Sequence, residues 1–255
     1  MHFLCLHGVG TNIKVLELQT SAIRFALGPG HTYDFVEGAL DHPMAPVVAI
    51  RPGISNLVSP TDTFHAYFAP TSGLSMLSAL RDLVALIADA DPPYDGVVGF
   101  SHGSCLAATL LLRPSPSPLA RLAEHSAFAT LRARAPAPFR VAVFFSAGMA
   151  ADYAALQADE VKMLEQTQAQ APSSGERAAV PMTIDIPTAH VFAENDEVAP
   201  GQGHLLARLC SAQGRHVSTH RLGHCIPGAG ERRDLDNAVR AIRGAISDAE
   251  ARGKG

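Results

Sequence analysis

Residues 99–103 read Gly99-Phe100-Ser101-His102-Gly103 and follow the pattern G-x-S-x-G. In this pattern a serine occupies a sharp turn between a strand and a helix, and the flanking glycines leave room for a strained backbone. A serine hydroxyl attacks a carbonyl carbon efficiently only when a neighbouring base takes its proton. The motif therefore predicts nucleophilic acyl chemistry at Ser101. The plainer alternative is a serine that caps an ordinary buried helix.

The chain offers an acid and a base after Ser101, in the order acid and then histidine that this kind of turn requires. Asp196 follows a predicted strand, and His224 follows the next one in a glycine-containing loop. Glu194 and Glu197 are rivals for the acid by position. Asp196 is favoured because Asn-Asp is typical of a turn and because its side chain is short. We expect His224 to be the base and Asp196 to orient it.

Two backbone N–H groups are expected to stabilise the negative oxygen of the tetrahedral intermediate. One belongs to His102, the residue after the nucleophile. The other comes from the loop after the first predicted strand, and Val9 is its best candidate. Loss of one such donor typically costs about 3 kcal/mol of barrier stabilisation.

Other chemistries have weaker support. His216, His220 and His224 are spaced by four, but the run contains no carboxylate and no H-E-x-x-H motif, so a zinc site there remains only an alternative. Cys225 beside His224 is interpreted as a small packing residue and not as a redox or metal group. A cysteine nucleophile next to its own histidine is not expected either, because catalytic partners are usually distant in sequence.

Cofactor motifs are incomplete. The loop Gly8-Val9-Gly10 follows a strand, but Ile13 stands where a dinucleotide fingerprint needs its third glycine. The sequence also contains no G-x-x-x-x-G-K-[ST] phosphate loop. We expect neither a cofactor nor a metal.

The elements that must position these residues alternate between strand and helix. This alternation predicts an α/β fold with a mostly parallel sheet and helices on both faces, whose strands end at one ligand-binding edge. Together with the serine turn it indicates the α/β-hydrolase fold. The predicted strands are 3–6, 32–36, 96–100, 139–145, 189–193 and 217–221, and the predicted helices are 12–27, 73–90, 102–112 and 232–250, with Thr11 or Asn12 capping the first helix.

The 255 residues fit one domain, 1–255, interrupted by two irregular segments after strands. These segments, 37–73 and 148–183, are candidate lid or substrate-pocket insertions, because long structureless stretches in compact domains are often functional. Their apolar side chains are expected either to line an acyl pocket or to pack the loops, and they are Tyr67, Phe68, Leu74, Met149 and Tyr153.

Composition narrows the class of partner. The net charge is −4 and no Lys/Arg block occurs, which argues against a nucleic-acid or anionic-membrane surface. No apolar run approaches the roughly 18 residues of a membrane span, and the first residues do not resemble a signal peptide. The four cysteines lack any metal-binding spacing and are expected to be reduced thiols. These features predict a cytoplasmic protein.

Four blocks of the sequence resemble the fungal serine hydrolase (FSH) family. They are LCLHGVGTN at 4–12, PYDGVVGFSHG at 93–103, HVFAENDEV at 190–198 and GHCIP at 223–227. The family includes thioesterases that release polyketides from their synthases. The resemblance implies Ser101, Asp196 and His224 as the triad. It also implies Val9 and His102 as oxyanion donors. This chain has His102 where the family often has glutamine.

The resemblance implies that the chain cleaves a small-molecule acyl ester or thioester, either free or bound to a carrier protein. Two alternatives stay open. An acyltransferase would use the same residues, with an alcohol or amine replacing water. A catalytically silent binding protein would keep the fold without turnover.

Overall fold

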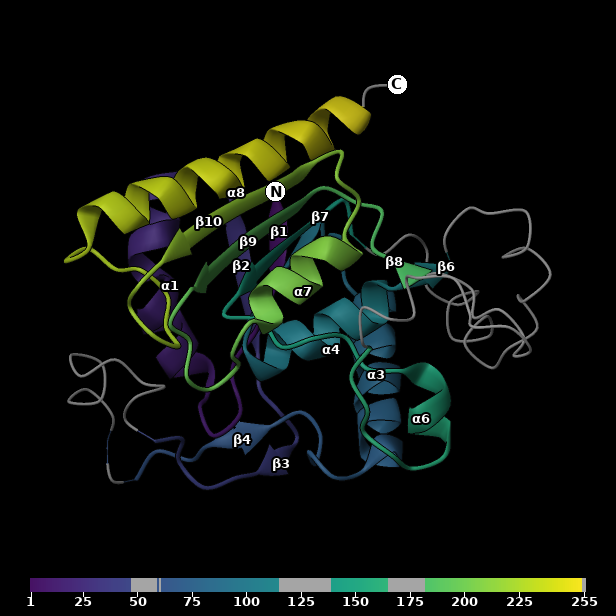
Figure 1. Ribbon diagram of the computed structural model, residues 1–255. Coiled ribbons are helices and arrows are strands. Elements are labelled where there is room, and N and C mark those ends of the chain that lie inside the picture. The colour runs from purple at the N-terminus through teal and green to yellow at the C-terminus, as the bar shows by residue number, and fades with distance from the viewer. Residues whose placement is uncertain (47–58, 60, 115–138, 165–181, 254–255) are drawn as a thin grey trace.

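A central sheet of six parallel strands organises the chain (Figure 1). The computed structural model describes residues 1–46, 59, 61–114, 139–164 and 182–253. The strand order is β10-β9-β7-β5-β1-β2, and every neighbouring pair is parallel. The strands are β1 (His2–Leu6), β2 (Thr32–Val36), β5 (Gly96–Phe100), β7 (Val141–Phe145), β9 (Thr188–Ala193) and β10 (Arg215–His220).

Alternate side chains along the strands separate two hydrophobic layers. Phe3 and Cys5 of β1 pack beside the helices α1 (Ile13–Leu27) and α8 (Arg232–Arg252). Leu4 and Leu6 face the opposite layer. That second layer is built by the helices α3 (Gly73–Ala88), α4 (His102–Leu111), α6 (Tyr153–Gln157) and α7 (Gln202–Leu209). Helices on both faces of a parallel sheet confirm the predicted α/β arrangement.

Most predicted elements are present, with small shifts at their ends. Asn12 is the N-cap of α1, because its side chain accepts a hydrogen bond of 2.9 Å from the Val15 N–H. The strand predicted at 139–145 begins only at Val141. Before it, Arg140 donates its N–H to the carbonyl of Asp95. The strand predicted at 217–221 spans 215–220.

Among the described residues, six elements were not predicted. Two are the helices α6 and α7, and the others are short strands that form two antiparallel pairs outside the central sheet. These strands are β3 (Leu40–Asp41), β4 (His65–Ala66), β6 (Arg113–Pro114) and β8 (Met182–Thr183).

The two irregular segments are described only in part. Segment 37–73 contributes the β3–β4 pair, while 47–58 and residue 60 lie outside the described residues. Segment 148–183 contributes α6, and 165–181 lies outside. The proposal that these segments form a lid or a pocket therefore concerns residues that are only partly described.

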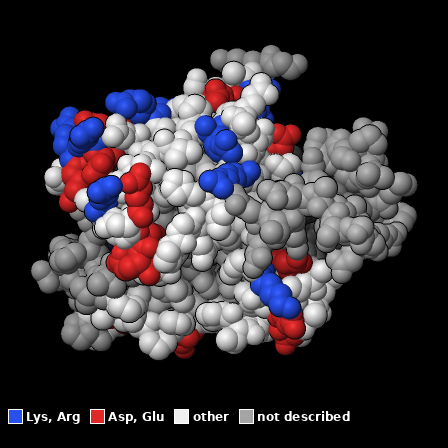
Figure 2. All heavy atoms as spheres, in the orientation of Figure 1, with Lys and Arg blue, Asp and Glu red and all other residues white. Residues whose placement is uncertain are grey.

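Charges on the face drawn in Figure 2 lie in several small groups, most of which have acidic side chains beside the basic ones. Within the described ranges, no helix has the length and apolar character needed to cross a membrane.

Candidate active site

Ser101 occupies the turn between β5 and α4 with φ 51° and ψ −111°, a conformation that non-glycine residues rarely adopt. Its backbone N–H donates to the Phe145 carbonyl at 3.0 Å. The flanking glycines are required by close backbone contacts. A Cβ on Gly99 would lie 2.6 Å from Ser104 Cα, and one on Gly103 would lie 2.4 Å from the Leu6 oxygen. The structure therefore has the strained strand–turn–helix that the motif predicts.

The imidazole of His224 reaches Ser101 from the loop after β10. Its Nε2 lies 2.8 Å from Ser101 Oγ. The side chain is buried, and its ring lies 5.3 Å from that of Phe100. Gly223 before it has φ 69°, the left-handed conformation that glycine adopts readily and that turns the loop here. This geometry lets Nε2 accept the serine proton.

Asp196, in the loop after β9, holds the other side of the imidazole. Its two carboxylate oxygens lie 2.9 and 2.8 Å from His224 Nδ1. One of them, Oδ1, also accepts the N–H groups of Val198 and Ala199. Burial raises the pKa of Asp196, but the hydrogen bonds from His224 and the two N–H groups outweigh it, so the pKa is lowered. The carboxylate is therefore kept ionised opposite Nδ1.

The rival acids lie elsewhere. Glu194 accepts a hydrogen bond from Thr219 and lies 3.5 Å from the Arg221 guanidinium. Glu197 is exposed, with its carboxylate near Gly223. Neither is bonded to His224.

Val9 follows a glycine that lies close to Ser101, and His102 follows Ser101 itself. Gly8 is joined to Val9 by a peptide bond and lies close to Ser101. A Cβ on Gly8 would lie 3.6 Å from the serine Cβ. His102 begins α4 directly after Ser101. Within the described part of the chain, neither N–H has a hydrogen-bond acceptor. Both therefore suit a developing oxyanion.

The His102 side chain is engaged with the protein. Its Nε2 accepts the Phe68 N–H at 3.4 Å, and its ring stacks on that of Phe68 with centroids 3.9 Å apart. Burial, followed by repulsion from His7 and His42, lowers the pKa of His102 to about 3. The ring is therefore neutral at physiological pH and holds the segment around Phe68 against the nucleophile turn.

The predicted pocket residues fall into different places. Phe68 is buried against His102, and the ring of Tyr67 lies 6.1 Å from the same imidazole. Met149 is buried and its N–H donates to the Gln202 side chain, whereas Tyr153 is only partly buried on α6. Leu74 is exposed and lines no buried surface. Tyr67 and Phe68 thus lie next to the nucleophile turn.

The zinc alternative finds no support in the geometry. His216 pairs with Asp248 at 2.8 Å, whereas His224 contacts Ser101 and Asp196. Among the described residues, no group of three or more His, Cys, Asp or Glu could hold a metal ion. Cys225 is buried, and its thiol donates to the Leu222 carbonyl at 3.2 Å.

Ser146 was not singled out by the sequence. It follows β7 with φ 41°, and its buried hydroxyl donates to the Cys225 carbonyl at 3.2 Å. It therefore ties the loop that carries His224 to the sheet. The only sign of Ser146 in the sequence was its position after a predicted strand, and many residues share that position.

A family model and several known proteins match this sequence. A family model described as "Serine hydrolase (FSH1)" matches residues 1–235. Esterase FPY3 of Fusarium mangiferae is 36% identical over 251 residues, which cover 98% of each chain. Hydrolase FUB4 of Gibberella moniliformis (strain M3125 / FGSC 7600) is 29% identical over 147 residues, which are 58% of this chain. That match covers 47% of FUB4, so the two sequences align over about half of this relative.

A solved structure supports the fold. The carboxylesterase from Mesorhizobium loti superposes with a TM-score of 0.53 at 16% identity, covering 95% of this chain and 88% of that one. At this level of identity the likeness concerns the α/β-hydrolase fold alone.

Proposed function

This chain belongs to the serine hydrolase (FSH1) family, and from that premise we propose that it cleaves small-molecule acyl esters or thioesters through Ser101, His224 and Asp196. The observation that carries the proposal is the unbroken line of contacts across the imidazole. Nε2 lies 2.8 Å from Ser101 Oγ, and Nδ1 lies 2.8 Å from Asp196 Oδ2.

The reaction follows from this line. Ser101 Oγ forms a bond to the acyl carbon while its proton moves to His224 Nε2, and the carbonyl electron pair moves onto the oxygen. The N–H groups of Val9 and His102 stabilise that oxygen. When the tetrahedral intermediate of an oxyester collapses, His224 gives its proton to the leaving alcohol. With a thioester, the thiolate leaves and is protonated by His224. Water then repeats the sequence on the acyl-enzyme and releases the acid.

The negative carboxylate of Asp196 stabilises the imidazolium that forms in both steps. The carboxylate accepts a hydrogen bond from Nδ1 and so holds the ring with Nε2 toward Ser101. The lowered pKa of Asp196 means that this carboxylate is ionised across the neutral range.

Two substrate classes fit the same machinery. The name of the relative FPY3 supports an oxyester. The resemblance to polyketide-releasing thioesterases supports an acyl thioester on a carrier protein or on coenzyme A. We propose that the acyl group is released as a free acid and that a polyketide acyl chain is a candidate substrate.

A fluorophosphonate probe tests the nucleophile. We expect the wild-type protein to be labelled once, at Ser101, and Ser101→Ala and His224→Ala to lose the labelling. The control is Ser21→Ala, because Ser21 is an exposed serine on α1 whose hydroxyl bonds only to its own helix. Labelling that persists in Ser101→Ala would overturn the proposal.

A panel of acyl thioesters and matched oxyesters of increasing chain length tests the substrate. A dedicated polyketide thioesterase should prefer long or cyclisable acyl thioesters. Equal rates across the panel would contradict that assignment while leaving the hydrolase chemistry intact.

A further inference from the structure

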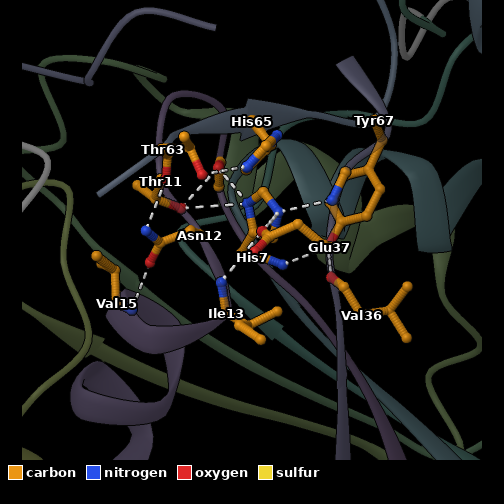
Figure 3. Close-up of polar contacts among 12 residues, drawn as sticks. His7, Thr11, Asn12, Ile13, Val15, Val36, Glu37, Thr63, His65 and Tyr67 are labelled. Atoms are coloured by element: carbon orange, nitrogen blue, oxygen red, sulfur yellow. Dashed lines mark hydrogen bonds and ion pairs between the residues drawn. The ribbon is translucent and has the colours of Figure 1, made fainter. Parts of the chain in front are cut away.

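His7 is a fully buried histidine directly after β1, at the start of the loop that carries Val9. Its ring lies 4.7 Å from the ring of Tyr67, whose hydroxyl accepts the His7 N–H and donates to the Val36 carbonyl. Figure 3 shows the ring among polar groups that follow β2, lie in and after β4, and precede α1. A buried imidazole with this many contacts has a fixed orientation.

The carbonyl oxygen of Gly8 is the point on which this cluster converges. It lies 2.7 Å from His7 Nδ1, and it accepts the Thr11 hydroxyl at 2.7 Å and the Thr11 N–H at 3.2 Å. Because a carbonyl can only accept, Nδ1 carries a hydrogen in this contact. Thus three donors hold one carbonyl.

The same peptide unit contains the N–H of Val9. A peptide group is planar and trans, so its C=O and N–H point in opposite directions. Fixing the Gly8 carbonyl toward His7 and Thr11 therefore fixes the Val9 N–H away from them. Gly8 itself lies close to Ser101, since a Cβ on Gly8 would lie 3.6 Å from the serine Cβ, and the Gly103 N–H donates to the His7 carbonyl at 3.0 Å.

Glu37, directly after β2, holds the far side of the imidazole. Its Oε1 lies 2.9 Å from His7 Nε2 and also accepts the N–H of Ile13, the first residue of α1, at 3.2 Å. The Gly38 N–H also approaches Nε2, at 3.0 Å. The carboxylate suits a charged ring and the N–H suits a neutral one, but Nδ1 keeps its hydrogen toward Gly8 in both cases.

We propose that Thr11 and His7, backed by Glu37, are positioning residues that aim the Val9 N–H at the oxyanion formed when Ser101 attacks an ester. This inference rests on the proposed function. Substitution of any of the three residues should therefore weaken transition-state stabilisation and leave ground-state binding of the substrate unchanged, because none of the three side chains needs to touch the substrate.

Thr11→Val tests the proposal, because valine keeps the shape and removes the hydroxyl donor. We expect kcat to fall about tenfold, less than the roughly 10²-fold to 10³-fold seen when a direct donor is removed, with KM within about twofold. Thr11→Ser should recover most of the loss. The matched control is Thr20→Val, since Thr20 is also buried and donates to a backbone carbonyl, that of Leu16, away from the site.

The inhibition constant of a trifluoromethyl ketone is a measurement that should not change if these residues were merely structural. Ser101 Oγ adds to the carbonyl carbon of the ketone, the proton passes to His224, and the negative oxygen occupies the oxyanion position. The inhibition constant should rise in Thr11→Val by the same factor as kcat falls. His7→Leu should behave alike, and His7→Asn should recover part of the effect, because its amide nitrogen stands near the position of Nδ1.

Unchanged kcat and inhibition constant in folded Thr11→Val and His7→Leu would overturn the inference, and so would a fall in kcat without a rise in the inhibition constant. If these buried substitutions lower the melting temperature, Glu37→Ala repeats the comparison at a side chain that is 35% exposed, with the same two readouts and a smaller expected effect. Activity that survives Ser101→Ala and His224→Ala would instead overturn the proposed function, so the two failures are distinguishable.

Discussion

His224 Nε2 lies 2.8 Å from Ser101 Oγ although 123 positions separate the two residues in the chain. They follow β10 and β5, which are not neighbours, because β9 and β7 lie between them in the sheet. The loop after β10 therefore has to cross the ends of two strands to bring the imidazole to the serine. The contact depends both on the strand order and on the shape of that loop.

The acid can be identified by comparing three carboxylates in one loop. We expect Asp196→Asn to lower kcat by about 10³-fold to 10⁴-fold, because the amide no longer stabilises the imidazolium or the correct ring tautomer. Glu194→Gln and Glu197→Gln should stay within about threefold, since neither side chain contacts His224. Steady-state ester hydrolysis measures all three. A large loss in Glu197→Gln with a mild one in Asp196→Asn would reverse the assignment.

Gly103→Ala should destabilise the protein and lower activity. A Cβ there would lie 2.4 Å from the Leu6 oxygen and 2.7 Å from the His7 oxygen, so backbone has to move. Such overpacking costs about 1–3 kcal/mol of unfolding free energy. Urea unfolding and ester hydrolysis measure the two effects. Gly30→Ala is the control, because a Cβ at Gly30 meets nothing within 4 Å. Equal stability of the two variants would contradict the contact.

The residues of the proposed triad could be singled out in the sequence because each follows a recognisable strand. Ser101 lies in a five-residue motif, and Asp196 and His224 come after apolar segments in the expected order. The strand order brings such loop residues to one edge of a parallel sheet. The pattern of the chain therefore predicted the fold, and the three residues that it proposed as a triad lie within hydrogen-bond distance of one another along the line Ser101–His224–Asp196.

The supporting residues could not be predicted, because their partners are set by tertiary structure. Ser146 donates a hydrogen bond to the carbonyl of Cys225, and His7 contacts Glu37, which follows another strand. The helix α7 was missed for a related reason. It is short, its N-cap Gly201 has no side chain to signal a start, and it contains Gly203. A Cβ at that glycine would lie 2.4 Å from the Phe192 ring, so packing requires a residue that disfavours helix.

Two buried histidines should make the protein sensitive to acid. Burial, followed by nearby positive charges, lowers the pKa of His102 and of His190 to about 3. An imidazole in the unfolded chain titrates near about 6.5. Below that pH the unfolded chain binds protons that the folded protein does not, so the free energy of unfolding falls as the pH drops toward about 3. Each histidine contributes about 1.4 kcal/mol per pH unit in this window.

His190→Phe isolates one of these contributions, because His190 is fully buried beside Phe144 and away from Ser101. Between about pH 7.5 and pH 5, the variant should lose about 2 kcal/mol less stability than the wild type, as measured by urea unfolding. His204→Gln, which changes an exposed histidine on α7, is the control for the loss of an imidazole elsewhere. Identical pH dependence in His190→Phe would show that His190 does not contribute.

Ser146 combines a strained backbone with a buried hydrogen bond, and two substitutions separate them. Ser146→Ala keeps a side chain at φ 41° and removes the bond to the Cys225 carbonyl. We expect it to lose about 1–2 kcal/mol of unfolding free energy, because a buried hydrogen bond is lost. Ser146→Gly removes the same bond but accepts a positive φ at no steric cost. Its stability should therefore equal or exceed that of Ser146→Ala.

We expect the activity of the two variants to depend on the hydrogen bond alone, and their stability to depend on both the hydrogen bond and the backbone strain at Ser146. Because the loop that carries His224 is released in either variant, both should lower kcat several-fold to a similar extent, about the effect of a small misplacement of a catalytic group. The fluorophosphonate labelling rate should fall with kcat, since it also depends on His224. Wild-type kcat in Ser146→Ala would show that Ser146 does not position His224. A Ser146→Gly variant less stable than Ser146→Ala would show that the backbone at this residue is not strained.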